Sequence, residues 1–230
     1  MAELLQSTTL WAVVLTLAAY QAALWLRKKW NSPLCNPIVV SVILVAAVLL
    51  LLKLPNEEYQ SSWAKLSWLL TPATICLALP MYEQLRTLRK DLPAILAGVA
   101  GGTLTSLSCI FGLGRLFGLN AQLIISLLPK SITTAMGIAL SEQYGGIAAI
   151  TSAAIIATGI GGSICGTGLC KLFRIQGEVA QGVAFGTAAH VIGTSKATEL
   201  SELCGAVGSL SLVVAGILTA VLLPALTPFF

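Results

Sequence analysis

The sequence predicts an all-α integral membrane protein with about six spanning helices and two additional polar segments. The chain of 230 residues is 57% hydrophobic and 10% charged, whereas about a quarter of the residues in a soluble domain are charged. Several apolar runs approach the roughly 20 residues that a helix needs to span a bilayer. Strict alternation of apolar and polar residues, typical of a membrane barrel, is absent. We expect a single polytopic domain over residues 1–230.

The first span is predicted at residues 10–26. Three basic residues, 27–29, follow it at once, and Glu3 is the only charged side chain before it. A signal peptide carries its positive charge before the apolar run, so we expect a retained helix. Because basic residues favour the cytoplasmic side, the C-terminal end of this helix is expected inside.

The second and third spans are predicted at residues 37–54 and 66–82. Pro37 suits a first helical turn, where proline costs no hydrogen bond. The acidic loop between the two spans is expected outside. Pro72 and Pro80 predict that the third span is kinked or interrupted.

Three later spans are predicted at residues 92–113, 147–172 and 203–223. A basic cluster at residues 86–90 is expected to form a loop before the first of them. A second basic cluster, at residues 171–174, ends the middle one. Both clusters are expected on the cytoplasmic side, with the basic residues that follow the first span.

Two of these spans share a short motif. Residues 97–103 and 157–163 match around a double glycine, at 101–102 in one and 161–162 in the other. If the segment between the two spans is a hairpin, they run in opposite directions, as an inverted repeat requires. We also expect a homo-oligomer, and we expect one of the glycine pairs to mark a close helix contact, either within the chain or between chains.

Two segments, residues 120–143 and 178–200, are too polar for ordinary spans. They combine glycine, proline, lysine and hydroxyl residues in apolar surroundings. Each is either a re-entrant hairpin or an unwound helix that crosses the membrane. Hairpins are favoured because they place the basic residues 171–174 on the cytoplasmic side.

The first polar segment supplies four candidate substrate-binding residues: Lys130, Ser131, Thr133 and Thr134. Irregular backbone at membrane depth is tolerated only where it is buried in protein or lines a wet cavity. The N-terminal ends of half-helices attract anions, and a small carboxylate fits such a place. A charge near the bilayer centre costs about 2.5–3.5 kcal/mol, so a deep Lys130 needs a compensating role. We expect Lys130 to bind the carboxylate.

The second polar segment adds five candidate substrate-binding residues: Thr187, His190, Gly193, Thr194 and Ser195. Each hydroxyl has an alternative role, because serine and threonine in helices often bond a preceding carbonyl of their own helix. His190, the only histidine, is either a satisfied structural group or a titrating group. Its reference pKa of about 6.5 suits proton coupling.

Five residues are candidates for a supporting role around the site: Asn36, Glu83, Glu142, Lys196 and Glu199. Lys196 and Glu199 have an alternative role, since residues three apart on a helix are spaced for a surface ion pair.

The sequence does not suggest an enzyme, a metal site, a cofactor or a nucleic-acid partner. The six cysteines lack the spacing of a zinc site, and no nucleophile turn or metalloprotease motif is present. The net charge of +4 reflects basic residues in short loops.

Residues 128–134, Leu-Pro-Lys-Ser-Ile-Thr-Thr, and residues 186–194, Gly-Thr-Ala-Ala-His-Val-Ile-Gly-Thr, resemble the LrgB/CidB membrane family. Their combination is specific, and the resemblance extends over most of the chain. It implies a multi-pass protein of the bacterial inner membrane, often working beside a small LrgA/CidA-type membrane partner.

The resemblance leaves two functions open. One is secondary transport of a small monocarboxylate such as pyruvate, glycolate or glycerate, with the hydroxyls reading its 2-oxo or 2-hydroxy group. The other is holin-like or antiholin-like regulation of murein hydrolases without transport, which predicts leakage that depends on assembly and no saturable uptake.

Overall fold

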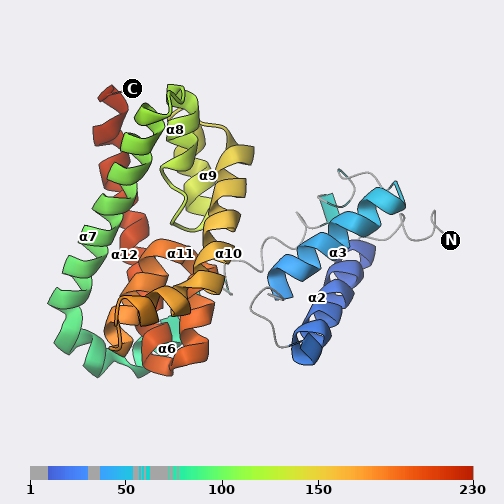
Figure 1. The fold of residues 1–230 in the computed structure, drawn as a ribbon, viewed down its shortest axis with the longest axis horizontal. Helices are drawn as coiled ribbons and strands as arrows, with labels where there is room; N and C mark the ends of the chain where they lie inside the picture. Colours follow the sequence, from blue (N-terminus) through green and yellow to red (C-terminus); the bar gives the residue numbers. More distant parts are fainter. Residues whose placement is uncertain are drawn as a thin grey trace. The chain divides into compact units, whose positions relative to one another are not determined.

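The computed structural model describes residues 10–30, 37–53 and 78–229, together with isolated residues between 57 and 76 (Figure 1). Every regular element in the described part is a helix. The chain forms two compact units, Met1–Cys76 and Leu77–Phe230. The single domain expected over the whole chain stays a prediction.

In the first unit, α2 (Leu10–Trp30) and α3 (Pro37–Leu51) pack against each other. Pro37 is the first residue of α3, as the sequence predicts. α2 runs beyond its predicted end, so its last turn contains the basic residues 27–29. Positive charge there interacts favourably with the negative end of the helix dipole. The third predicted span lies largely outside the described residues.

Three helices of the second unit are long and apolar enough to cross a membrane: α7 (Leu85–Leu116), α10 (Ala148–Leu172) and α12 (Glu202–Leu226). They correspond to three of the predicted spans. In the first unit, Val39–Leu51 is a shorter apolar helix segment. The described part of the chain is therefore an all-α membrane protein.

The basic residues 86–90 do not form the expected loop. They belong to the first turns of α7, which starts directly after the short α6 (Ala78–Glu83). Arginine, lysine and leucine are good helix formers, and nothing between Leu85 and Asp91 stops the helix. A helix of 32 residues is about 48 Å long, well beyond the roughly 30 Å of a hydrocarbon core. The basic turns therefore extend α7 past its apolar part.

The first polar segment contains the predicted break. α8 (Ala121–Leu127) and α9 (Thr134–Gln143) are separated by residues 128–133, which are not α-helical. The chain reverses there, as the close approach of residues on either side of the break shows. A Cβ placed at Gly137 would lie only 3.3 Å from the carbonyl oxygen of Pro129. α8 and α9 thus form a helical hairpin.

The second polar segment also reverses, within α11 (Glu178–Leu200), which consists of two helical halves joined by a kink. Ala189 and His190 leave helical geometry, and His190 has a φ of 42°. A Cβ at Gly193 would lie 2.7 Å from the carbonyl oxygen of Phe185. Residues eight apart in a straight helix are separated by about 12 Å along the axis, so the two halves of α11 lie side by side.

Hydrogen bonds hold the first hairpin against α10. The Oγ1 of Thr151 donates to the Oγ of Ser141 at 2.6 Å, and the Ile147 amide donates to the Oγ of Ser126 at 2.7 Å. All three hydroxyl residues are fully buried. Because Gly137 and Ser141 face Ile155 and Thr151 respectively, α9 and α10 run antiparallel.

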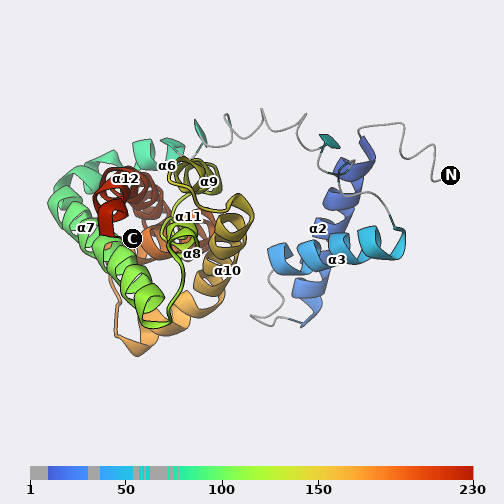
Figure 2. The ribbon, with the colours of Figure 1, turned by 90° about the horizontal axis from the view of Figure 1, so that it is seen from above.

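α7 and α8 are antiparallel as well, since Gly114 faces Ile124 and Ser106 faces Ser131. α7 and α10 consequently run in opposite directions. The α8–α9 hairpin follows the C-terminal end of α7 and the α11 hairpin follows that of α10, so the two hairpins approach each other from opposite ends (Figure 1). Viewed end-on, α8 and α11 overlap in a space surrounded by α7, α10 and α12 (Figure 2).

We predict that Gly186→Ala destabilises the second unit by about 1–3 kcal/mol, the usual cost of overpacking a core. An added methyl group at this position would collide with the backbone of Gly208 on α12, which cannot rotate away. Gly161→Ala is the control, because nothing lies within 4 Å of its Cβ position. Thermal unfolding in detergent measures both, and equal melting temperatures would contradict the close packing of α11 on α12.

We predict that cysteines introduced at Arg89 and Arg174 in a cysteine-free variant react with a membrane-impermeant maleimide from the same side of the membrane. The start of α7 and the end of α10 lie at one end of the unit, and Gly118, after α7, lies at the other. A cysteine at Gly118 should react from the opposite side. Labelling of positions 89 and 174 from opposite sides would contradict this arrangement.

Candidate functional site

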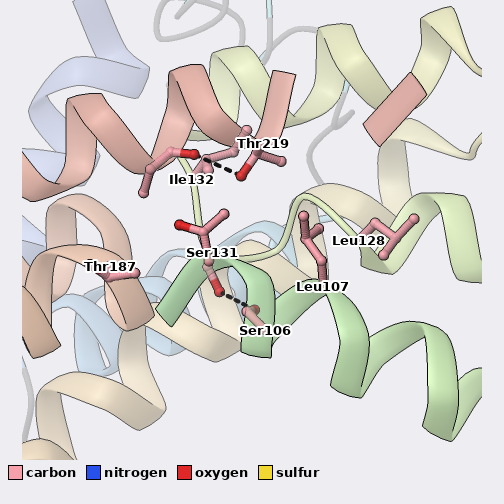
Figure 3. Close-up of a pocket in the computed structure, with 9 residues that line it drawn as sticks. Ser106, Leu107, Leu128, Ser131, Ile132, Thr187 and Thr219 are labelled. Atoms are coloured by element: carbon pink, nitrogen blue, oxygen red, sulfur yellow. Dashed lines mark hydrogen bonds between the residues drawn. The ribbon is translucent and has the colours of Figure 1, made fainter. Parts of the chain in front are cut away.

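A small cavity lies where the two hairpins meet (Figure 3). It has room for about one water molecule in this conformation. Its wall comes from α7, the break between α8 and α9, α11 and α12. The lining residues are Thr103, Ser106, Leu107, Leu128, Ser131, Ile132, Thr187, Ala215 and Thr219.

Two hydroxyls in this wall lack a partner. The Oγ1 atoms of Thr103 and Thr187 are buried without a hydrogen bond, although these residues are only 4% and 5% exposed. Thr219 differs, because its Oγ1 donates to the carbonyl of Ala215 at 2.7 Å. Leaving a buried hydroxyl unpaired costs roughly 1–3 kcal/mol, and most such groups in proteins bond to protein or to ordered water. The cavity is therefore suited to a small polar ligand or water.

The break between α8 and α9 brings a charge next to the cavity. The Nζ of Lys130 donates to the Oγ of Ser131 at 3.0 Å, and that oxygen lies 3.3 Å from the Oγ of Ser106. Ser131 lines the cavity, whereas Lys130 stands beside it. Thr133 has a structural position, because its Oγ1 accepts from the Met136 amide and caps α9.

His190 lies at the reversal of α11 and is buried, with 3% exposed. Its Nε2 is 2.8 Å from the carbonyl oxygen of Ile155 on α10, so that nitrogen carries the proton and donates. A non-glycine residue at a φ of 42° is uncommon and costs free energy that the surroundings must offset. The ring packs against Gly159, where any side chain would collide with it. These contacts fix the reversal, and a role of His190 in carrying protons stays a prediction.

Several other predicted residues lie away from the cavity. Thr194 donates to the carbonyl of His190 and Ser195 to that of Val191, each at 3.0 Å, which is the bond to the residue's own helix that the sequence left open. Gly193 packs against Phe185 and Ala189. Thr134 is exposed.

The supporting residues are also peripheral where the structure describes them. Lys196 and Glu199 form an ion pair of 2.6 Å on the exposed side of α11. Glu83 and Glu142 are exposed, and Asn36 lies outside the described residues. Of the sequence candidates, the structure thus brings Ser131 and Thr187 to the cavity, with Lys130 bound to Ser131.

Sequence reasoning missed Thr103, Ser106 and Thr219, which complete the polar part of the wall. Thr103 and Ser106 stand three apart directly after the double glycine of α7, so both lie on one face of that helix. This spacing could have identified Thr103 and Ser106 as candidates from the sequence. Thr219 had none, because a single threonine in an apolar helix is common. In the described part of the chain, no cluster of three histidine, cysteine or acidic residues could hold a metal.

These features define a multi-pass α-helical membrane protein with a small cavity, lined partly by hydroxyl side chains, where two opposed helical hairpins meet. The chain belongs to the LrgB-like family, which it matches over residues 16–229. The relatives described next are from bacteria, and the family and the long apolar helices are consistent with a multi-pass bacterial membrane protein.

Three relatives illustrate the similarity. The Holin-like protein CidB of Staphylococcus epidermidis (strain RP62A) is 33% identical over 230 residues, which cover 100% of both chains. The protein of the same name from Staphylococcus aureus (strain Mu50) is 31% identical over 95% of both chains. The uncharacterized protein YwbG of Bacillus subtilis (strain 168) is 34% identical over 95% of this chain and 97% of its own. No solved structure matches the chain.

We predict that His190→Ala lowers the free energy of unfolding by about 1–3 kcal/mol, because the buried ring's hydrogen bond to the Ile155 carbonyl and its packing against Gly159 are both lost. Ser195→Ala is the control, since Ser195 is exposed on the same helix and should change stability by less than about 0.5 kcal/mol. Thermal unfolding in detergent measures both. If His190→Ala is as stable as the control, the contact does not hold the reversal.

Proposed function

We propose that this protein is a secondary transporter of small monocarboxylates of the pyruvate, glycolate or glycerate type. The observation that carries the proposal is the cavity where the two hairpins meet, with its buried, unpaired hydroxyls of Thr103 and Thr187. Hydroxyls bind carboxylate, 2-oxo and 2-hydroxy oxygens without the cost of burying a second charge. Lys130, one residue from the wall, supplies positive charge nearby.

The proposal includes an arrangement in the membrane. The α8–α9 and α11 hairpins enter from opposite sides as re-entrant segments, and about six helices span the bilayer. The opposite directions of α7 and α10, each followed by a hairpin, support an inverted repeat. Transporters built this way bind substrate near the bilayer midplane, where the broken helices meet.

A cavity with room for about one water molecule is too small for a three-carbon acid. Transport therefore requires the hairpins to separate, and the geometry described here is a closed state of the cycle. Domain and hinge motions of this kind occur in microseconds to milliseconds. We further propose that the protein works as a homo-oligomer, with a small LrgA/CidA-type membrane partner as an additional subunit to be tested.

The second candidate function is holin-like or antiholin-like regulation of murein hydrolases without substrate transport. The name of the staphylococcal relatives, Holin-like protein CidB, favours this candidate over transport. It predicts that solutes leak across the membrane to an extent that grows with the degree of assembly of the protein. It also predicts that this flux does not saturate as the concentration of any acid rises. The two functions thus differ in a measurable property, the concentration dependence of flux.

Purified protein in liposomes decides between them. Uptake of labelled pyruvate and glycolate is measured with and without a pH gradient, beside release of an encapsulated neutral dye. Saturable uptake that unlabelled acid inhibits, without dye release, supports transport. Dye release without saturable uptake supports the regulator and overturns the transporter.

We predict that His190→Gln abolishes accumulation driven by a pH gradient and leaves exchange of labelled for unlabelled acid intact. Glutamine keeps a hydrogen-bond donor for the Ile155 carbonyl but does not titrate near neutral pH. Exchange needs no net proton movement, so it should persist in the same liposomes. Normal accumulation by this variant across the pH range would show that His190 is purely structural.

A further inference from the structure

Lys130 is close to the cavity but does not reach its wall. Ser131 lines the cavity and Lys130 does not. The Nζ of Lys130 lies 3.0 Å from the Oγ of Ser131. Within the part of the chain that the structure describes, no carboxylate lies at ion-pair distance from Lys130. The ammonium group therefore makes its hydrogen-bonded contact with the cavity wall at one hydroxyl group, that of Ser131.

The direction of the hydrogen bonds follows from their chemistry. An ammonium group only donates, so Lys130 occupies a lone pair of the Ser131 oxygen. The proton of that hydroxyl is then left for Ser106, whose Oγ lies 3.3 Å away, or for a ligand in the cavity. Bonds to charged donors are roughly twice as strong as neutral ones, and they polarise the next bond in a chain. Ser131 is therefore a stronger donor than an ordinary serine.

The rest of the cavity wall also favours a ligand that accepts hydrogen bonds. Its polar side chains are neutral hydroxyls, and those of Thr103 and Thr187 are buried without partners. A cation in this space would lie close to the Lys130 ammonium and be repelled. An oxygen atom with free lone pairs, such as a carboxylate or carbonyl oxygen, matches a wall of this kind.

We propose that Lys130 is a positioning residue that acts on the substrate through Ser131, and that the substrate's oxygen is bound by the polarised Ser131 hydroxyl. This inference rests on the proposed transport function and changes its mechanism. The direct ion pair between Lys130 and the carboxylate, expected from the sequence, is replaced by a relay of two side chains. Lys130 and Ser131 then form one functional unit.

A double-mutant cycle tests the relay. Lys130→Met, Ser131→Ala and the double variant are compared for the KM of pyruvate and glycolate uptake in liposomes, with Lys196→Met as the control for loss of one lysine charge. Ser131→Ala is expected to raise KM about tenfold, because a hydrogen bond between its hydroxyl and a charged carboxylate contributes roughly 1.5 kcal/mol or more. Lys130→Met is expected to raise KM by a smaller factor, because it removes only the polarisation of that bond. The double variant should be no weaker than Ser131→Ala. An effect in the double variant equal to the product of the two single effects would show that Lys130 contacts the substrate directly and overturn the relay.

A second readout separates failure of the relay from failure of the proposed function. The same cycle is run on ligand-free melting temperatures in detergent, and on the rise in melting temperature with added acid. Effects that add in the ligand-free protein overturn the relay even if transport is real. A third outcome is that the two substitutions are coupled in the ligand-free melting temperatures, while the unmodified protein neither binds nor takes up the acid. This outcome overturns both the proposed function and the role of Lys130 and Ser131 in binding substrate. Coupling in all readouts supports the relay.

Discussion

The reversal of α11 at Ala189 and His190 is the constraint on which the rest of the second unit depends. Two half-helices lie side by side there because Gly193 allows the carbonyl of Phe185 to approach. The His190 ring donates to the Ile155 carbonyl on α10 and ties the reversal to that helix, while the Thr194 hydroxyl donates to the backbone carbonyl of His190. Backbone groups inside a membrane must be satisfied by protein or by a wet cavity, so a reversal at this position requires such neighbours.

The packing of the α11 hairpin against its neighbouring helices also positions the cavity. Gly159, Gly162 and Gly166 on one face of α10 pack against this hairpin. On the other side of the hairpin, Gly186 packs against Gly208 of α12. α11 can therefore approach both helices closely, as small residues permit in membrane proteins. This approach brings Thr187 to α7, where it contacts Gly102 and lines the cavity. Packing far from the polar groups thus decides which hydroxyls meet.

Ile155 connects the two hairpins. Its carbonyl binds His190 of α11, and its side chain packs against Gly137 of α9. A displacement of either hairpin therefore changes the environment of the same fully buried residue. Well-packed interiors transmit such strain because they leave few voids. For a transporter whose hairpins must separate, this contact couples the two movements, and for a regulator without a substrate it stabilises one closed arrangement.

The sequence by itself determined the all-α membrane class, the positions of the described apolar helices and the two breaks, because apolar run length and clusters of proline, glycine and hydroxyls are local properties. It also identified Ser131 and Thr187. Only the tertiary structure decided the other wall residues, Thr103, Ser106 and Thr219, and the outward pairing of Lys196. A hydroxyl in an apolar helix bonds its own carbonyl or faces a neighbour at similar cost, so the packing of other helices selects between the two.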